Sequence, residues 1–285
     1  MKVLPDVMLE KSDKYQQLDW VGMTEIQSAM QVKQMIVPVS LDIGVNLAEN
    51  SRGIHMSRLY QLQQAHLLNQ RLATDTFQKL TKDCLQSHDT ISSVCAIKIK
   101  LQWAMTTRSL KSNLAGFRQY PVQIIFEQRK NEFKTWLQFE ILYSSTCPQS
   151  ASVALEVIKS EGTLGAYERL LATPHAQRSR SVLKLQVNDL SETTIDALIE
   201  GSEQALGTPV QTTVKKIDEM EFARLNANNL MFCEDAARKL ANYLAQAENI
   251  LGYSVYCEHQ ESLHPHNASS MSAKNYSSPS CLSFS

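Results

Sequence analysis

The sequence predicts an α+β fold built from two related modules. Segments of strand and helix character follow one another in the order strand, two helices, strands, and this order occurs roughly twice. Strict alternation of single strands with helices would instead indicate a parallel βαβ sheet. Residues 97–103 alternate apolar and polar side chains, which is typical of a strand with one face toward water.

The first half of the chain contains this order of strands and helices once. Residues 1–32 are weakly patterned and are interpreted as an N-terminal arm. Residues 35–46 are rich in β-branched side chains and predict the first strand. Hydrophobic periodicity then predicts helices at 59–72 and 74–87, followed by strands at 97–103, 121–127 and 133–143.

The second half repeats the order with longer loops. Helical periodicity runs from residue 151 to about residue 171, and a polar loop is expected at 173–180. Further elements are a strand at 183–187, a helix at 195–206 started by residues 191–194, helices at 222–225 and 236–250, and a strand at 253–257. Residues 267–285 contain 8 Ser in 19 positions and predict a disordered tail. The expected division is an arm (1–32), a bimodular catalytic domain (33–266) and this tail.

Composition narrows the class of protein. The 285 residues are 43% hydrophobic and 20% charged, which is typical of a globular protein. The net charge of −1 favours neither nucleic acid nor an anionic membrane as a partner. No apolar run is long enough to span a bilayer, and the opening residues lack a secretory signal. Six scattered cysteines without a close pair suggest free thiols in a reducing cytoplasm.

Cys147 lies at a corner between a predicted strand and a predicted helix. Residues 136–143 are apolar and strand-like, residues 151–158 are helical, and Pro148 suits the first helical turn. A thiolate there would be stabilised by the amides of the helix terminus and could serve as a metal ligand or a nucleophile. The short segment 145–150, taken by itself, favours a small buried structural cysteine instead.

Several other polar clusters could supply partners for the thiol. They comprise residues 52–58, 175–178, 218–219 with 234–235, and 261–266. A thiolate, a carboxylate and an imidazole would make a plausible three-ligand catalytic metal site. The spacings do not resemble those of a zinc finger, and each cluster is equally compatible with solvated loop charges, helix-terminal carboxylates or a surface ion pair such as Glu234 with Arg238.

Six motifs in register give the chain a family resemblance over about residues 18–268. They are Arg-Gly-Ile-His-Met-Ser-Arg at 52–58, Thr-Cys-Pro at 146–148, His-Ala-Gln-Arg at 175–178, Lys-Lys-Ile-Asp-Glu at 215–219, Phe-Cys-Glu-Asp at 232–235 and Glu-Ser-Leu-His-Pro-His at 261–266. With these motifs the sequence resembles the bacterial GTP cyclohydrolases of type IB. It departs from many relatives at Gln149, where they carry a second cysteine, and in the 28-residue spacing from Cys147 to His175.

The resemblance implies a tunnelling fold (T-fold), with two fused modules that each have an antiparallel sheet backed by helices. It also implies a cytoplasmic homotetramer with active sites at subunit interfaces. The implied reaction is that of a hydrolase acting on cyclic amidine C–N bonds. It opens the guanine imidazole ring of GTP, giving 7,8-dihydroneopterin triphosphate and formate, and is the first step of tetrahydrofolate biosynthesis.

The resemblance also implies roles for individual residues. Cys147, Glu219 and His264 match metal ligands, and His175 matches either a fourth ligand or a proton-transfer group. One divalent metal per subunit is expected, and zinc, manganese and iron all suit this donor set. Glu234 matches the carboxylate that accepts from the guanine edge. The remaining residues expected to contact substrate are Arg52, His55, Arg58, Gln177 and Arg178.

Two other functions fit some of the same residues. A tunnelling-fold nitrile reductase would use Cys147 as a covalent nucleophile, with NADPH as hydride donor, and would leave Glu219 and His264 without a metal to bind. A non-catalytic oligomer that binds purines or pterins is the other alternative. A cyclohydrolase of this family requires a metal and the nitrile reductase does not, so a test for a metal requirement distinguishes these two functions.

Overall fold

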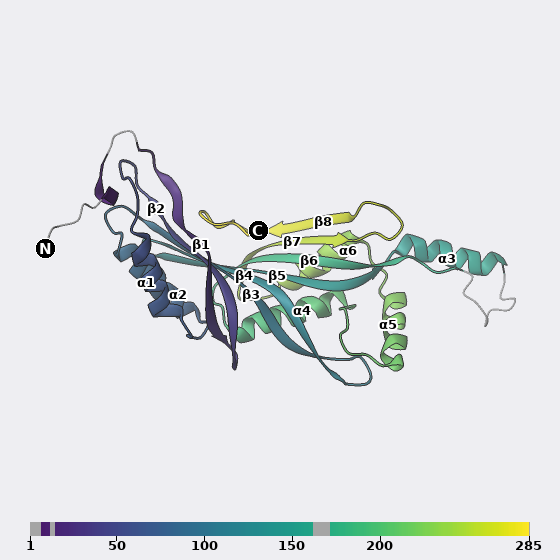
Figure 1. Ribbon diagram of the computed structural model, residues 1–285. Helices are drawn as coiled ribbons and strands as arrows, with labels where there is room; N and C mark the ends of the chain where they lie inside the picture. Colours follow the sequence, from purple (N-terminus) through teal and green to yellow (C-terminus); the bar gives the residue numbers. More distant parts are fainter. Residues whose placement is uncertain (1–6, 12–14, 162–171, 285) are drawn as a thin grey trace.

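A single antiparallel sheet forms the frame of the molecule (Figure 1). The computed structural model describes residues 7–11, 15–161 and 172–284. Within this part the eight strands lie in the sheet in the order of the sequence. The strands are β1 (Leu18–Val32), β2 (Met35–Leu47), β3 (Val94–Arg108), β4 (Ala115–Arg129), β5 (Glu132–Thr146), β6 (Ala176–Val187), β7 (Ile250–His259) and β8 (Ala268–Lys274).

The helices of the described residues occur in the order that the sequence predicts. They are α1 (Met56–Leu67), α2 (Thr74–Gln86), α3 (Pro148–Glu161), α4 (Glu192–Leu206), α5 (Lys216–Asn228) and α6 (Cys233–Leu244), with a short 3-10 turn at Val7–Leu9. Two strands, helices and two strands therefore occur twice, with α3 inserted between β5 and β6. The predicted α+β class with two related modules is confirmed, and the modules join through the β4–β5 pairing.

The main core lies between the sheet and the helices that cover one of its faces. On α2, Phe77, Leu80 and Cys84 are fully buried, and their spacing places them on one side of the helix. The ring of Phe77 stacks on that of Phe126 from β4, with centroids 4.3 Å apart. In the second module α4 and α6 pack on each other, and α6 packs on β7 and β8. The helix-facing core is therefore continuous through both modules.

Local sequence explains where α4 begins and ends. The Oγ of Ser191 accepts a 3.1 Å hydrogen bond from the Thr194 amide, as expected of an N-cap serine. Gly207 closes the helix with a φ of 84°, a left-handed conformation that glycine adopts without steric cost. The predicted helix start at 191–194 is thus confirmed.

The predicted N-terminal arm is wrong for residues 18–32. These residues form β1, which pairs with β2 from Leu18↔Leu47 to Val32↔Met35. As the outermost strand of the sheet, β1 is only partly buried along most of its length, so its sequence lacks the apolar pattern of a core strand. The other residues assigned to the arm include positions 1–6 and 12–14, which lie outside the described residues.

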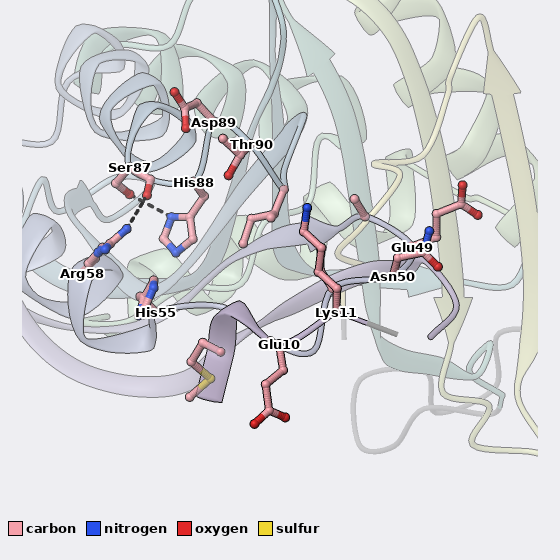
Figure 2. A pocket seen from close by; sticks show the side chains of 15 residues that line it. Glu10, Lys11, Glu49, Asn50, His55, Arg58, Ser87, His88, Asp89 and Thr90 are labelled. Atoms are coloured by element: carbon pink, nitrogen blue, oxygen red, sulfur yellow. Dashed lines mark hydrogen bonds between the residues drawn. The ribbon is translucent and has the colours of Figure 1, made fainter. Parts of the chain in front are cut away.

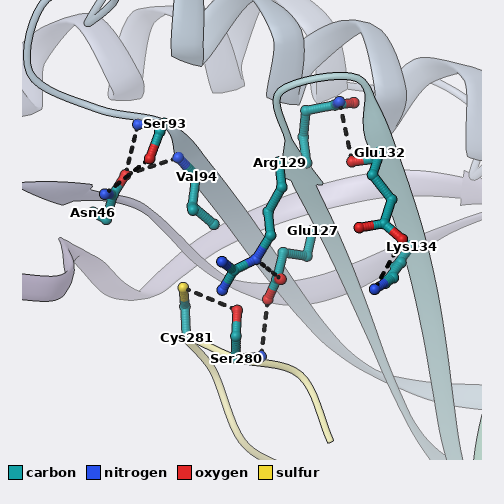
Figure 3. A network of polar contacts seen from close by, with 10 residues as sticks. Asn46, Ser93, Val94, Glu127, Arg129, Glu132, Lys134, Ser280 and Cys281 are labelled. Atoms are coloured by element: carbon teal, nitrogen blue, oxygen red, sulfur yellow. Dashed lines mark hydrogen bonds and ion pairs between the residues drawn. The ribbon is translucent and has the colours of Figure 1, made fainter. Parts of the chain in front are cut away.

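The prediction of a disordered tail is also wrong for residues 268–284. Ala268–Lys274 forms β8, which pairs with β7 through main-chain groups and needs few apolar side chains to do so. The chain then crosses the sheet face opposite the helices, where Leu282 joins Ala96, Ile125 and Trp136 in a small second core. Figure 3 shows Ser280 of this segment donating from its amide to Glu127 at 3.0 Å, beside the Arg129–Glu127 ion pair.

One predicted loop and several element ends differ from the structure. The polar loop expected at 173–180 is a strand from Ala176 onward, because β6 pairs there with β5 and β7 despite its polar composition. The helix expected to continue to about residue 171 is seen to Glu161, and residues 162–171 lie outside the described residues.

The described helices include none with the length and apolar character needed to cross a membrane.

Candidate active site

Cys147 lies where β5 ends and α3 begins. Its carbonyl accepts the first helical hydrogen bond, 3.0 Å from the Ala151 amide. The Ser150 amide points at Sγ from 3.5 Å. Amide dipoles at a helix start favour negative charge on a nearby sulfur, so the predicted thiol at a strand-to-helix corner is present.

His175 lies beside Cys147 although 28 positions separate them. The Cys147 amide donates to the His175 carbonyl at 3.2 Å, and the His175 amide donates to Ser150 Oγ at 3.0 Å. Nδ1 of the His175 ring lies 3.0 Å from Gln177 Oε1 and 3.6 Å from Glu261 Oε2. The two residues are therefore neighbours in space despite the long spacing between them in the sequence.

Glu219 lies in the first turn of α5, at the mouth of a neighbouring cleft. The cleft has a volume of about 540 Å³, and Gln177, Arg178, Glu219 and Phe222 are among the residues that line it. Asp218 holds this end of α5 against the β3–β4 turn by accepting from the amides of Lys111, Ser112 and Lys215 at 2.7, 2.9 and 2.8 Å. Burial acts to raise the pKa of Asp218, but hydrogen bonds from Ser112, Lys215 and Lys111 outweigh it and hold the pKa well below its usual range.

His264 lies in the exposed loop between β7 and β8. Its ring stacks on that of His266, with centroids 5.0 Å apart. The loop is tied to the start of β6, because the Gln260 amide donates to the Arg178 carbonyl at 3.2 Å. Ser262 Oγ adds a 3.4 Å bond to the Ala176 carbonyl. Cys147, Glu219 and the His264 loop thus all border the same short stretch of β6.

The donor types at this place suit a divalent metal, although they do not form a preformed cluster. Within the described part of one chain, no three His, Cys, Asp or Glu side chains come close enough together to hold an ion. Cys147 and His175 lie together, while Glu219 and His264 are exposed and approach from α5 and the β7–β8 loop. A thiolate, an imidazole and a carboxylate are ligands that zinc, iron and manganese accept.

Glu234 occupies the first turn of α6 and is exposed. Its own backbone amide and the Cys233 thiol donate to the carboxylate and lower the pKa of Glu234. The segment that leads into α6 is joined to the end of β5 by a 3.0 Å bond from the Met231 amide to the Thr146 carbonyl. The carboxylate is therefore ionised at neutral pH. It lies on α6, and the segment that leads into α6 is bonded to Thr146, the residue next to Cys147.

The predicted basic residues of the first module lie elsewhere. Arg58 and His55 line a pocket of about 470 Å³ together with Ser87 and His88 (Figure 2). Arg58 Nη1 donates to the Ser87 carbonyl at 2.9 Å, and Arg52 pairs with Glu10. Figure 1 places α1 and α2 at the end of the molecule opposite α3 and α5. A single chain therefore does not bring Arg52, His55 or Arg58 to Cys147.

Sequence reasoning missed a set of buried polar side chains behind Cys147. Tyr143, Ser145, Ser179 and His259 come from three neighbouring strands and are at most 2% exposed. Burial lowers the pKa of His259 to about 4, although Glu234 and Asp235 act in the opposite direction. The one available signal was that uncharged polar residues at 177, 179 and 181 alternate with arginines at 178 and 180, which in an extended segment would place the charged and the uncharged side chains on opposite faces.

Comparison with known proteins decides the family. The sequence profile described as type I GTP cyclohydrolase FolE2 matches residues 4–270. The chain belongs to this family. The GTP cyclohydrolase FolE2 of Hydrogenovibrio crunogenus is 36% identical, with 95% of this chain and 94% of that protein covered. The protein of the same name from Citrobacter koseri is 38% identical over 93% of this chain and 96% of that protein. The family does not favour the nitrile reductase or the non-catalytic alternative.

Solved structures support the fold of the family. The uricase from Arthrobacter globiformis is similar with a TM-score of 0.52 at 9% identity, covering 90% of this chain and 93% of that one. A highly active mutant of the urate oxidase from Bacillus sp. TB-90 gives a TM-score of 0.50 at 8% identity, covering 90% and 99%. At these identities the likeness concerns the fold alone, and it confirms the predicted tunnelling fold.

Proposed function

We propose that this protein is a GTP cyclohydrolase that hydrolyses GTP to 7,8-dihydroneopterin triphosphate and formate, the first step of tetrahydrofolate biosynthesis, in the cytoplasm. Membership of the family over nearly the whole chain carries the proposal. The structure supports it with a thiol at a helix start, an adjoining histidine and a cleft that holds a carboxylate and an arginine.

The proposal includes one divalent metal per subunit, held by Cys147, Glu219 and His264, with His175 as a fourth ligand or a proton carrier. When bound, the metal would lower the pKa of a coordinated water to about 7, which suits attack on a purine carbon at neutral pH. Glu219 and His264 are exposed on α5 and on the β7–β8 loop, and metal binding would require both side chains to move toward the Cys147 thiol.

The other residues of the site bind and orient the substrate in this proposal. Glu234, ionised at neutral pH, would accept two N–H bonds from the guanine edge. Arg178, on the cleft wall, would offer its guanidinium to the triphosphate. His175 would take up or return a proton as the imidazole ring of the base opens and formate leaves.

A homotetramer with active sites shared between subunits would explain why some of the expected substrate-binding residues lie far from Cys147 within one chain. Arg52, His55 and Arg58 lie at the end of the molecule remote from Cys147 (Figure 1), so they would serve the site of a neighbouring subunit. Co-expression of Arg58→Ala and Cys147→Ala tests this arrangement. If the residues act in different subunits, mixed oligomers of the inactive Cys147→Ala protein and the weakly binding Arg58→Ala protein contain some sites with both native residues, and these sites regain the wild-type KM for GTP. Absence of complementation, with mixed oligomers verified by mass, would contradict shared sites.

The reaction itself is tested by incubating metal-loaded protein with GTP and measuring formate together with fluorescent neopterin after oxidation. Cys147→Ala, Glu219→Ala and His264→Ala should each lose metal retention and formate release. Matched controls are Cys281→Ala, Glu200→Ala and His66→Ala, which remove the same groups away from the site and should keep both properties. Full activity in a metal-free ligand variant would refute the metal assignment, and an inactive metal-loaded wild type would refute the function.

A further inference from the structure

A chain of buried side-chain hydrogen bonds runs from the sheet interior to His175. His259 Nε2 lies 3.1 Å from Tyr143 Oη, and His259 Nδ1 lies 3.1 Å from Ser145 Oγ. Gln177 Nε2 donates to Ser145 Oγ at 2.8 Å, and Gln177 Oε1 lies 3.0 Å from His175 Nδ1. His259, Ser145 and Gln177 are 2%, 0% and 8% exposed, so these three side chains have little contact with water.

Strand register places these groups in line. Ser145 of β5 is opposite Gln177 of β6, and Tyr143 is opposite Ser179. Ser179 is in turn opposite His259 of β7. Because strand residues two apart share a face, all five side chains lie on one face of the sheet. A one-residue slip of β6 would turn Gln177 away from both of its partners.

The carboxylate of Glu261 sets the direction of the hydrogen bonds. Its Oε2 lies 3.6 Å from His175 Nδ1, which is too far for a hydrogen bond, but a negative charge at that distance favours the ring proton on Nδ1 over Nε2. The Gln177 amide must then present its oxygen to His175 and its NH₂ group to Ser145. Ser145 Oγ accepts that bond, and it also contacts Ser179 Oγ at 2.8 Å and His259. The orientation of the amide is thus determined from both ends.

We propose that His259, Ser145 and Gln177 form a positioning relay that fixes the ring of His175 in the Nδ1–H tautomer, with the lone pair on Nε2. The tautomer follows from the structure, and only the role of His175 as a ligand or proton carrier rests on the proposed function. A ligand and a proton acceptor both need that lone pair, and ordered groups behind a histidine commonly set its tautomer and rotation. Gln177, expected from the sequence to bind substrate, acts here through His175 because both ends of its amide are used inside the protein.

The test compares Ser145→Ala, Ser145→Thr and Ser202→Ala with the wild type. Ser145→Ala removes the acceptor of the Gln177 amide, while Ser145→Thr keeps a hydroxyl there. Ser202 is an equally buried serine on α4 that bonds to Leu198 O, and it controls for loss of a buried hydroxyl. The first readout is the ¹⁵N NMR spectrum of histidine-labelled protein, in which the protonated nitrogen of His175 is identified directly, with and without metal. The second is the steady-state kinetics with GTP.

The relay predicts mixed tautomers of His175 in Ser145→Ala and the Nδ1–H form in the other proteins. It predicts that kcat falls about 10- to 100-fold in Ser145→Ala with KM within about twofold of the wild type, and that Ser145→Thr restores kcat. A wild-type tautomer in Ser145→Ala would overturn the relay, as would an equal loss of kcat in Ser202→Ala. If the wild type has no activity on GTP, the proposed function fails, and the tautomer measurement still decides the relay.

Discussion

The indole nitrogen of Trp136 donates a 2.7 Å hydrogen bond to the carbonyl of Ser277, 141 residues further along the chain. This bond attaches the C-terminal segment to the sheet face opposite the helix-facing core. Ser277 Oγ continues the attachment by donating to Gln186 Oε1 at 3.0 Å, and the Lys98 ammonium donates to the Ser283 carbonyl at 3.2 Å. The segment is therefore part of the folded structure, and its packing contributes to stability.

Shortening Leu282 should destabilise the protein. The side chain is 9% exposed and packs with Trp136, so Leu282→Ala should lower the free energy of unfolding by about 2 kcal/mol. Trp136 fluorescence should shift to longer wavelength as water reaches the indole. Met271→Ala is the control, because Met271 is 71% exposed and its loss should change stability by less than about 0.5 kcal/mol. Equal effects in urea unfolding would contradict a packed tail.

Replacing Lys98 should leave a buried charge without its counter-ion. Lys98 Nζ lies 2.9 Å from Asp42 Oδ2, and the two side chains are 9% and 5% exposed. Lys98→Met should cost about 3–5 kcal/mol, and adding Asp42→Asn should recover part of this loss. Lys134→Met, which breaks the exposed pair with Glu132, should cost less than about 1 kcal/mol in the same urea titration. A double variant no more stable than Lys98→Met would contradict this account.

His259 should make the protein sensitive to mild acid. Its pKa is about 4 because burial penalises the charged ring, whereas an unfolded histidine titrates near 6.5. The lowered pKa means that the unfolded chain binds the extra proton, so stability is full above about pH 6.5 and falls as the pH drops toward 4. Two and a half pKa units correspond to about 3 kcal/mol. The ring contacts Tyr143 Oη and Ser145 Oγ, and the charges of Glu234 and Asp235 act to raise its pKa.

Urea unfolding at pH 7.5 and pH 4.5 measures this contribution. His259→Gln should lower stability at pH 7.5 and should flatten the pH dependence between these values. His266→Gln, at an exposed position in the β7–β8 loop, should keep the wild-type slope. An unchanged slope in His259→Gln would assign the acid sensitivity to other groups.

Two arginines at opposite ends of the molecule should affect the same kinetic constant. If Arg58 and Arg178 bind the triphosphate, Arg58→Ala and Arg178→Ala should each raise KM for GTP more than they lower kcat. Loss of one charged hydrogen bond of about 1.5–3 kcal/mol corresponds to a change of about 10- to 100-fold. Arg224→Ala should change neither constant, since Arg224 is exposed and lies near Glu221. A fall in kcat alone would contradict a binding role.

Periodicity predicted most of the fold, and the exceptions share a physical cause. The helices and the strands at 35–46, 97–103 and 133–143 carry an apolar stripe or alternation that burial requires. The outermost strands, β1 and β8, are held mainly by main-chain pairing and expose many side chains. The start of β6 buries Gln177, Ser179 and Ser181, so its interior face is polar. None of these segments carries the hydrophobic signal by which strands are recognised.

The candidate site was less predictable from the residues alone. A thiol at a helix start is visible in the local sequence around Cys147, but its partners come from positions far apart in the chain. Motifs shared with the family supplied those partners, and the structure places Cys147 and His175 side by side through a main-chain bond. Tyr143 and His259 gave no signal, because a single polar residue in an otherwise ordinary strand is as common at the surface as in the interior.

The strand order has a consequence for the synthesis of the protein. Each strand pairs with its neighbours in the sequence, so the first module can form its four-stranded sheet before the second has left the ribosome. Cys147, His175, Glu219 and His264 all belong to the later half, and β8 follows the last of them. A nascent chain can therefore form the sheet of the first module before Cys147, His175, Glu219 and His264 have been synthesised.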